Sequence, residues 1–305
     1  MRRIKHVHGT LCHVYQRSFR GRILFYSMKD YLLFFTILCT KAVRYRVRIL
    51  ALSLMPDHFH IIVETGSHTQ LASFMDVFTS LFAREFNIAT GQEGHIFRIP
   101  FGMADKFKAK SRRSALLYVL NNPVEKKLSL RAEQYRWTFL EYSRSKHPFS
   151  MPLDVSRCRK ILRNAVKLVE GEHQRGKHLS PKMLDIIFDG LDSNESEQLC
   201  DRIVSIYNVI DYDRATSFFD GYESMCLAAS SNTGSEYEIR EEFTPDSDTA
   251  YARLEEKVRE MTSLRNPRDV VRLEAEVKAR IATSALSSGL ATPLQVKKYL
   301  RLPDR

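Results

Sequence analysis

Apolar and polar residues alternate in two stretches near the start of the chain and recur at helical spacing between them. The alternation in 11–17 (LCHVYQR) predicts a first strand, and the apolar-rich residues 28–43 predict a helix. A second strand is expected over 45–54 (YRVRILALSL). The turn signal Met-Pro-Asp at 55–57 separates it from a partner strand at 58–64 (HFHIIVE), so the two strands read as a hairpin.

The pattern then returns to helical spacing. Leucines and phenylalanines three and four residues apart predict a helix over 69–89, and a glycine-bounded segment, 91–102, supplies a short fourth strand. A basic stretch, 106–113, leads into the next helix, 115–122 (ALLYVLNN), and we expect Pro123 to end it. The order β, α, β, β, α, β is that of the ferredoxin-like split βαβ fold. We therefore expect an α+β fold with an antiparallel sheet and one added helix after it.

Beyond residue 150 the chain changes character. Residues 155–212 read as helices, 230–248 as a polar acidic connector, and 250–281 as one charged amphipathic helix or a pair. The last stretch, 284–302, has the rhythm of two short helices around a Gly-to-Pro turn. That rhythm fits a helix-turn-helix and also an ordinary helical bundle. We predict two parts, residues 1–150 and a mainly helical accessory region, 151–305.

Basic residues are concentrated in the first half. Residues 1–150 have a net charge of +14, whereas 151–305 have −3. Such an imbalance favours a polyanionic partner, nucleic acid rather than membrane. Five cations within 106–113 would repel one another without a bound phosphate chain. The predicted nucleic-acid contacts are Arg46, Arg48, Lys106, Lys108, Lys110, Arg112, Arg113, Lys126 and Lys127.

Composition excludes several classes of protein. The longest strongly apolar run, 31–39, is about half of what a bilayer span needs. The five cysteines lie far apart with no CxxC pair, which argues against a zinc ribbon, a redox dithiol or a disulfide framework. The basic start of the chain has no apolar stretch long enough for a signal peptide. We expect a cytoplasmic protein with no membrane association.

His58 and His60 are the central chemical feature. Side chains two apart on a strand share a face, so these imidazoles can converge on one metal ion. A second pair, Tyr118 and Asn122, shares a helix face four residues apart; one could act as nucleophile while the other binds the same metal or phosphate. The spacing His6-x-His8 is the same, but it lies in a charged arm before a glycine, where no strand is expected.

These residues resemble a known family. The strings ALSLMPDHFHIIVET, HGTLCHVYQRSFRGRILF, LASFMDVFTSLFAREFN, LLYVLNNPVEKKL and YRWTFLEYS are similar to segments of the REP-associated tyrosine transposases. These are single-tyrosine HUH transposases with an IS200-like domain, and their pattern includes MPNHxH and YxxxNP. The resemblance runs from about His8 to Ser143 in order, and nothing comparable covers the rest of the chain.

The resemblance implies a site and a reaction. His58 and His60 would be ligands of a Mg²⁺ or Mn²⁺ ion, Tyr118 the nucleophile, and Asn122 the third ligand. Attack on single-stranded or hairpin DNA would give a 5′-phosphotyrosine and a free 3′-hydroxyl. Two departures concern DNA contacts: Asp57 replaces the asparagine usual before the first histidine, and 98–105 lacks the usual basic run.

Two alternatives remain open. A domesticated protein that binds hairpin or repeat DNA without cleaving it would keep the basic surface without needing Tyr118. A metallohydrolase of the amidohydrolase type also begins with His-x-His on a strand, but it needs further ligands, and His147, His173 and His178 lie in polar context. A monomer and a homodimer are equally compatible with the sequence.

Overall fold

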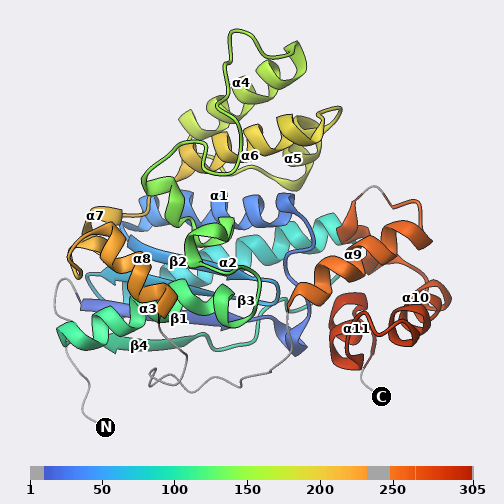
Figure 1. Cartoon of the computed structure of the whole chain (residues 1–305), viewed down its shortest axis with the longest axis horizontal. Coiled ribbons are helices and arrows are strands. Elements are labelled where there is room, and N and C mark those ends of the chain that lie inside the picture. The colour runs from blue at the N-terminus through green and yellow to red at the C-terminus, as the bar shows by residue number, and fades with distance from the viewer. Residues whose placement is uncertain (1–9, 232–247, 265, 304–305) are drawn as a thin grey trace.

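The computed structural model of the protein describes residues 10–231, 248–264 and 266–303 (Figure 1). Its centre is a four-stranded antiparallel sheet in the order β2-β3-β1-β4. The strands are β1 (Thr10–Arg17), β2 (Arg48–Met55), β3 (His58–Thr65) and β4 (Gly102–Lys106). The α+β fold with a ferredoxin-like sheet, expected from the order of elements, is confirmed.

Helices cover both faces of this sheet. The three helices are α1 (Met28–Tyr45), α2 (His68–Thr90) and α3 (Ala109–Glu125). Because side chains alternate along a strand, Val14 and Phe59 join the apolar core with α1 and α2, whereas Leu11 and Ile62 join a second core with α3. The central strand β3 is buried along its whole length. Polar groups on its α3 face therefore lie inside the molecule.

The second half of the chain packs around the first (Figure 1). Its helices are α4 (Lys160–Gln174), α5 (Pro181–Phe188), α6 (Ser193–Tyr207), α7 (Tyr212–Thr216), α8 (Tyr222–Ser231), α9 (Thr249–Met261), α10 (Ala275–Ser287) and α11 (Pro293–Leu300). Of the described short 3-10 helices, four lie in the first half, η1 (Phe19–Gly21), η2 (Ala132–Gln134), η3 (Arg136–Thr138) and η4 (Leu140–Ser143), and η6 (Pro267–Arg272) lies in the second. Helices α5 and α6 pack on α1, α8 packs on α3, and η6 packs on α2. The expected helical character beyond residue 150 is confirmed.

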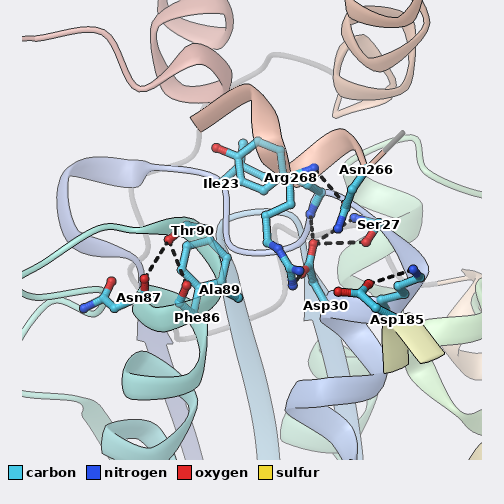
Figure 2. A network of polar contacts seen from close by, with 12 residues as sticks. Ile23, Ser27, Asp30, Phe86, Asn87, Ala89, Thr90, Asp185, Asn266 and Arg268 are labelled. Atoms are coloured by element: carbon cyan, nitrogen blue, oxygen red, sulfur yellow. Dashed lines mark hydrogen bonds and ion pairs between the residues drawn. The ribbon is translucent and has the colours of Figure 1, made fainter. Parts of the chain in front are cut away.

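A buried ion pair joins the two halves at the start of α1 (Figure 2). Arg268 Nη1 lies 2.8 Å from Asp30 Oδ1, and both side chains are almost fully buried. The other carboxylate oxygen of Asp30 accepts the backbone N–H groups of Tyr26 and Ser27, each at 3.0 Å. The carboxylate thus caps α1 and holds η6 against it.

The fourth strand does not lie where the glycine-bounded segment predicted it. Residues 91–102 form only one isolated bridge, between Ser18 and Phe97, and β4 begins at Gly102. Gly102 pairs with Tyr15 of β1, and a Cβ at position 102 would lie 2.1 Å from a ring atom of Tyr15. Only glycine leaves room for that ring, and the strand starts at this glycine instead of ending there.

Two element boundaries also differ from the prediction. Helix α1 continues to Tyr45, and Arg46 ends it in the left-handed conformation at φ 53°, so β2 begins only at Arg48. Helix α3 continues through Pro123 to Glu125. Proline in the last turn loses one N–H bond, and the helix still closes with the N–H of Lys126 bound to the carbonyl of Asn122 at 3.1 Å.

Two further expectations concern the second half. Most of the predicted acidic connector, from 232 to 247, lies outside the described residues. The pair of helices around the Gly-to-Pro turn is present as α10 and α11, which pack on each other and on α9. Among the described residues, no helix combines the length and apolarity that a bilayer crossing requires.

Candidate active site

The two central strands project four polar rings toward α3. His13 and Tyr15 alternate along β1, and His58 and His60 alternate along β3. In the antiparallel register His60 lies opposite Tyr15. Both His13 and His60 are fully buried, and His58 is 4% exposed. The sheet therefore gathers these rings in one layer beneath a helix.

The predicted residues of α3 reach this layer. The ring centroid of Tyr118 lies 5.4 Å from that of His60 and 5.6 Å from that of His13, and the His58 and His60 centroids are 5.1 Å apart. Asn122, one turn after Tyr118, places its Nδ2 3.3 Å from His60 Nε2. The four residues predicted for the site are thus neighbours. Their chemical roles stay predictions.

Asp57 orients His58. Its Oδ1 lies 2.6 Å from His58 Nδ1, and Lys298 Nζ of α11 lies 3.1 Å from its Oδ2. Burial by itself would raise the pKa of the Asp57 carboxyl, but the hydrogen bond to His58 and the charges of His58 and Lys298 together lower that pKa well below its usual range. The ionised carboxylate accepts the Nδ1 proton, so in the neutral form of this imidazole the lone pair is on Nε2.

His60 is held in the same tautomer by different partners. Burial, with smaller contributions from the charges of His58 and Arg17, lowers the pKa of His60 well below its ordinary value, so its imidazole is neutral. Asn122 Nδ2 donates to its Nε2, and its Nδ1 lies 3.1 Å from His13 Nε2. With Nε2 accepting from Asn122, Nδ1 of His60 carries the proton and donates it to His13 Nε2. The Nε2 lone pair faces Asn122.

This arrangement fits a divalent cation. Asn122 Oδ1 is buried and has no hydrogen-bond partner among the described residues. Rotating the amide would bring this oxygen to the side of His60 Nε2 in place of the N–H group. Two neutral imidazoles and an amide oxygen would leave the charge of the ion and its remaining coordination positions to phosphate oxygens.

Sequence reasoning missed two contributors to this site. His13 lies on the first predicted strand, and its alternation with Tyr15 was a usable signal. Lys298 had no such signal, because only the packing of α11 brings it to Asp57. A pocket opens beside His58, with Arg17, Lys126 and Lys298 among the cations in its wall. The second half of the chain thus contributes directly to the surroundings of the site.

The predicted nucleic-acid contacts fall into separate groups. Lys106 ends β4, and Lys108, Lys110, Arg112 and Arg113 follow around the start of α3. The guanidinium carbons of Arg112 and Arg113 lie 5.9 and 5.1 Å from the ring centroids of Phe218 and Phe219. The first turn of α3 carries no acidic residue, so its cations add to the positive end of the helix dipole.

The other predicted contacts lie elsewhere. Lys126 and Lys127 follow α3, and Lys126 lines the pocket beside His58. Arg46 ends α1. Arg48 has ion pairs with Glu64 at 3.2 Å and with Asp211 at 3.4 Å. These two carboxylates partly neutralise the positive charge that Arg48 could offer to a phosphate. The structure therefore brings most of these cations to the two ends of α3 and leaves Arg46 and Arg48 apart.

Part of the chain matches a known sequence family. Residues 6–119 match the sequence family described as Transposase IS200 like. This match confirms the family resemblance. The matched IS200-like segment contains both histidines and Tyr118 but ends before Asn122.

The chain was also compared with solved structures and with curated proteins. A solved structure of a REP-associated tyrosine transposase bound to a REP hairpin is 19% identical, with a TM-score of 0.37, and the alignment covers 45% of this chain and 79% of that one. No curated protein matches the chain.

Proposed function

We propose that the protein is a metal-dependent single-stranded DNA transposase that cleaves and rejoins hairpin-associated DNA through a 5′-phosphotyrosine. One observation carries this proposal. A tyrosine from α3 lies against two histidines of the central strands, inside the segment that matches the IS200-like transposases. The adjacent Asn122 and the cations around α3 support the same function.

His58 Nε2, His60 Nε2 and Asn122 Oδ1 would hold the Mg²⁺ or Mn²⁺ ion. When bound, the ion would withdraw electron density from the scissile phosphate and neutralise charge that develops on its oxygens. The protein's own contribution is orientation. Asp57 and His13 contact the Nδ1 side of the two imidazoles, and rotation of the Asn122 amide, which donates to His60 Nε2, would turn its oxygen toward the ion.

Tyr118 would supply the nucleophile. Its phenol oxygen would form a bond to phosphorus while the bond from phosphorus to the 3′-oxygen breaks; the phenol proton passes to water, and the 3′-oxygen takes up a proton. The product would be a phosphotyrosine ester, and Tyr118 is 6% exposed in the protein without DNA. Because that ester keeps the energy of the original bond, attack by another 3′-hydroxyl rejoins strands without ATP.

A cleavage assay tests this proposal. The full chain, incubated with a hairpin-containing single strand and Mn²⁺ or Mg²⁺, is expected to nick the DNA and to form a protein–DNA adduct that survives denaturation. Tyr118→Phe removes the attacking oxygen and keeps the ring, so nicking and adduct should disappear while DNA binding persists. His58→Ala should also stop nicking.

Either of two results would overturn the proposal. An adduct that persists in Tyr118→Phe would exclude this tyrosine as the nucleophile. Tight hairpin binding by the unmodified chain, with no nicking in either metal, would favour the alternative of a DNA-binding protein without cleavage activity.

A further inference from the structure

A second group of metal-ligating side chains lies on the opposite face of the sheet. Cys12 alternates with His13 on β1, so its side chain points toward α1 and α2, away from α3. Asp105 of β4 lies directly opposite Cys12 in the register. His68 is the first residue of α2. Three separate elements thus meet at this point.

The three side chains are close enough to share one ion. Cys12 Sγ lies 3.0 Å from Asp105 Oδ1, and His68 Nε2 lies 3.0 Å from Asp105 Oδ2. One ligand atom from each residue lies within 4.8 Å of the other two. Ligands at about 2.0–2.3 Å from a tetrahedral zinc ion are themselves separated by roughly 3.3–3.7 Å. Only small side-chain adjustments would therefore admit the ion.

Burial gives the site a closed side and an open side. Cys12 is fully buried, the Asp105 side chain is 12% exposed, and the His68 side chain is 41% exposed. The His68 imidazole is therefore the most exposed of the three side chains. A fourth position is left for water, as in zinc sites with three protein ligands.

We propose that Cys12, His68 and Asp105 bind a zinc ion that links β1, β4 and the start of α2. Sulfur, imidazole nitrogen and carboxylate oxygen form a donor set that Zn²⁺ accepts and Mg²⁺ does not favour. On binding, the Cys12 thiol loses its proton to solvent, and His68 carries its proton on Nδ1. The sheet separates this site from His58 and His60, and its donors select a different ion.

Cobalt provides a direct probe, because Co²⁺ replaces Zn²⁺ and absorbs in the near ultraviolet when bound to a thiolate. The full chain should bind about one Zn²⁺ that survives dialysis, and Co²⁺ should produce the thiolate absorption. Cys12→Ser should remove this absorption. The half-buried Cys158 lies outside the group, so Cys158→Ser should retain it.

Two further variants keep the test decisive. His68→Ala alters a side chain at the surface, so the fold should persist while a chelator removes zinc at concentrations at least about tenfold lower. His58→Ala should leave the cobalt–thiolate absorption unchanged. The proposal is wrong if the folded chain gives no such absorption, if Cys12→Ser retains it, or if His68→Ala holds zinc as tightly as the unmodified chain.

Discussion

Asp57 connects His58 to the last helix of the chain. Its carboxylate accepts from His58 Nδ1 and pairs with Lys298. A carboxylate on the far nitrogen makes an imidazole a stronger ligand and fixes its orientation, and loss of such a partner typically costs about 10–100-fold in metal affinity or activity. The aspartate at this position therefore acts on His58 as a positioning residue.

Asp57→Ala should accordingly reduce cleavage at limiting Mn²⁺ by about 10–100-fold, with partial recovery at high Mn²⁺. Asp57→Asn keeps an acceptor for the Nδ1 proton of His58, so its cleavage activity at limiting Mn²⁺ should fall less. The exposed Asp76 of α2 provides a control, since Asp76→Ala should leave the metal dependence unchanged. A metal titration of nicking measures all three, and equal behaviour of Asp57→Ala and Asp76→Ala would contradict this role.

Asp248 makes folding stability depend on pH. Burial and the nearby Asp57 carboxylate raise its pKa from 3.8 to about 6, although neighbouring basic groups oppose the increase. A raised pKa of an acid means that the folded state retains a proton that the unfolded state has lost. The resulting stabilisation is complete below the unfolded pKa and is lost as the pH rises through the folded pKa.

Asp248→Asn should therefore raise the free energy of unfolding at about pH 8, where the charged carboxylate is costly, by roughly 1–3 kcal/mol. At about pH 4 the increase should be much smaller, because the native carboxyl is already neutral. Urea denaturation at both pH values measures this. An equal change at the two pH values would show that the charge of Asp248 is not responsible.

At the residue scale, simple backbone periodicity was enough to indicate which side chains lie close together, while their roles stay predictions. His58, His60, Tyr118 and Asn122 were predicted to share one site, and alternation on a strand and one helical turn place them together. Lys298 could not have been predicted, because no local pattern indicates that α11 packs beside the β2–β3 turn.

At the level of elements, hydrophobic spacing located three strands and two helices of the first half within a few residues, whereas α3 begins at Ala109, before the apolar run that predicted it. The fourth strand was misplaced because its start depends on a tertiary contact, the Tyr15 ring above Gly102. Helix α3 passes Pro123 because packing against the sheet outweighs one lost N–H bond in the final turn. Local rules failed at the positions where distant residues decide the conformation.

The buried pair between η6 and α1 gives an element-scale prediction. Arg268→Ala leaves the Asp30 carboxylate buried without its cation, so we expect a loss of about 3–5 kcal/mol in the free energy of unfolding. Arg259 has an ion pair with Glu255 on α9, and its side chain is 62% exposed. Arg259→Ala should cost less than about 1 kcal/mol.

Urea denaturation of the two arginine variants provides the comparison. The difference between them should reflect burial, since each removes one guanidinium from an ion pair. Comparable losses in the two variants would contradict the assignment of the Asp30–Arg268 pair as the main polar link between η6 and α1.

On the scale of the whole molecule, the two halves are interdependent. Helices of the second half pack on α1, on α2 and on α3, and α11 contributes Lys298 to the surroundings of His58 (Figure 1). The division of the chain into two domains at residue 150 stays a prediction from the sequence. The net charge of +14 in the first half, with exposed lysines at the start of α3, remains the basis for expecting a polyanionic partner.

Binding to single-stranded DNA should weaken steeply as salt rises, because each lysine that contacts a phosphate releases a counterion. Replacing Lys108 and Lys110 by glutamine should reduce the slope of log K against log salt by about 0.7 for each phosphate that is no longer neutralised. Lys160 and Lys167, exposed on α4, provide the matched control and should leave the slope unchanged. A slope that does not respond to Lys108 and Lys110 would exclude these lysines as phosphate ligands.

The most direct measurement is to identify the residue that carries the DNA. After reaction with a hairpin-containing single strand, the adduct is digested and its modified peptide sequenced by mass spectrometry. We predict a nucleotide on Tyr118 and an unchanged yield in Tyr15→Phe, whose ring centroid lies 6.0 Å from that of His60 in the same layer. A nucleotide on Tyr15 or any other residue would contradict it.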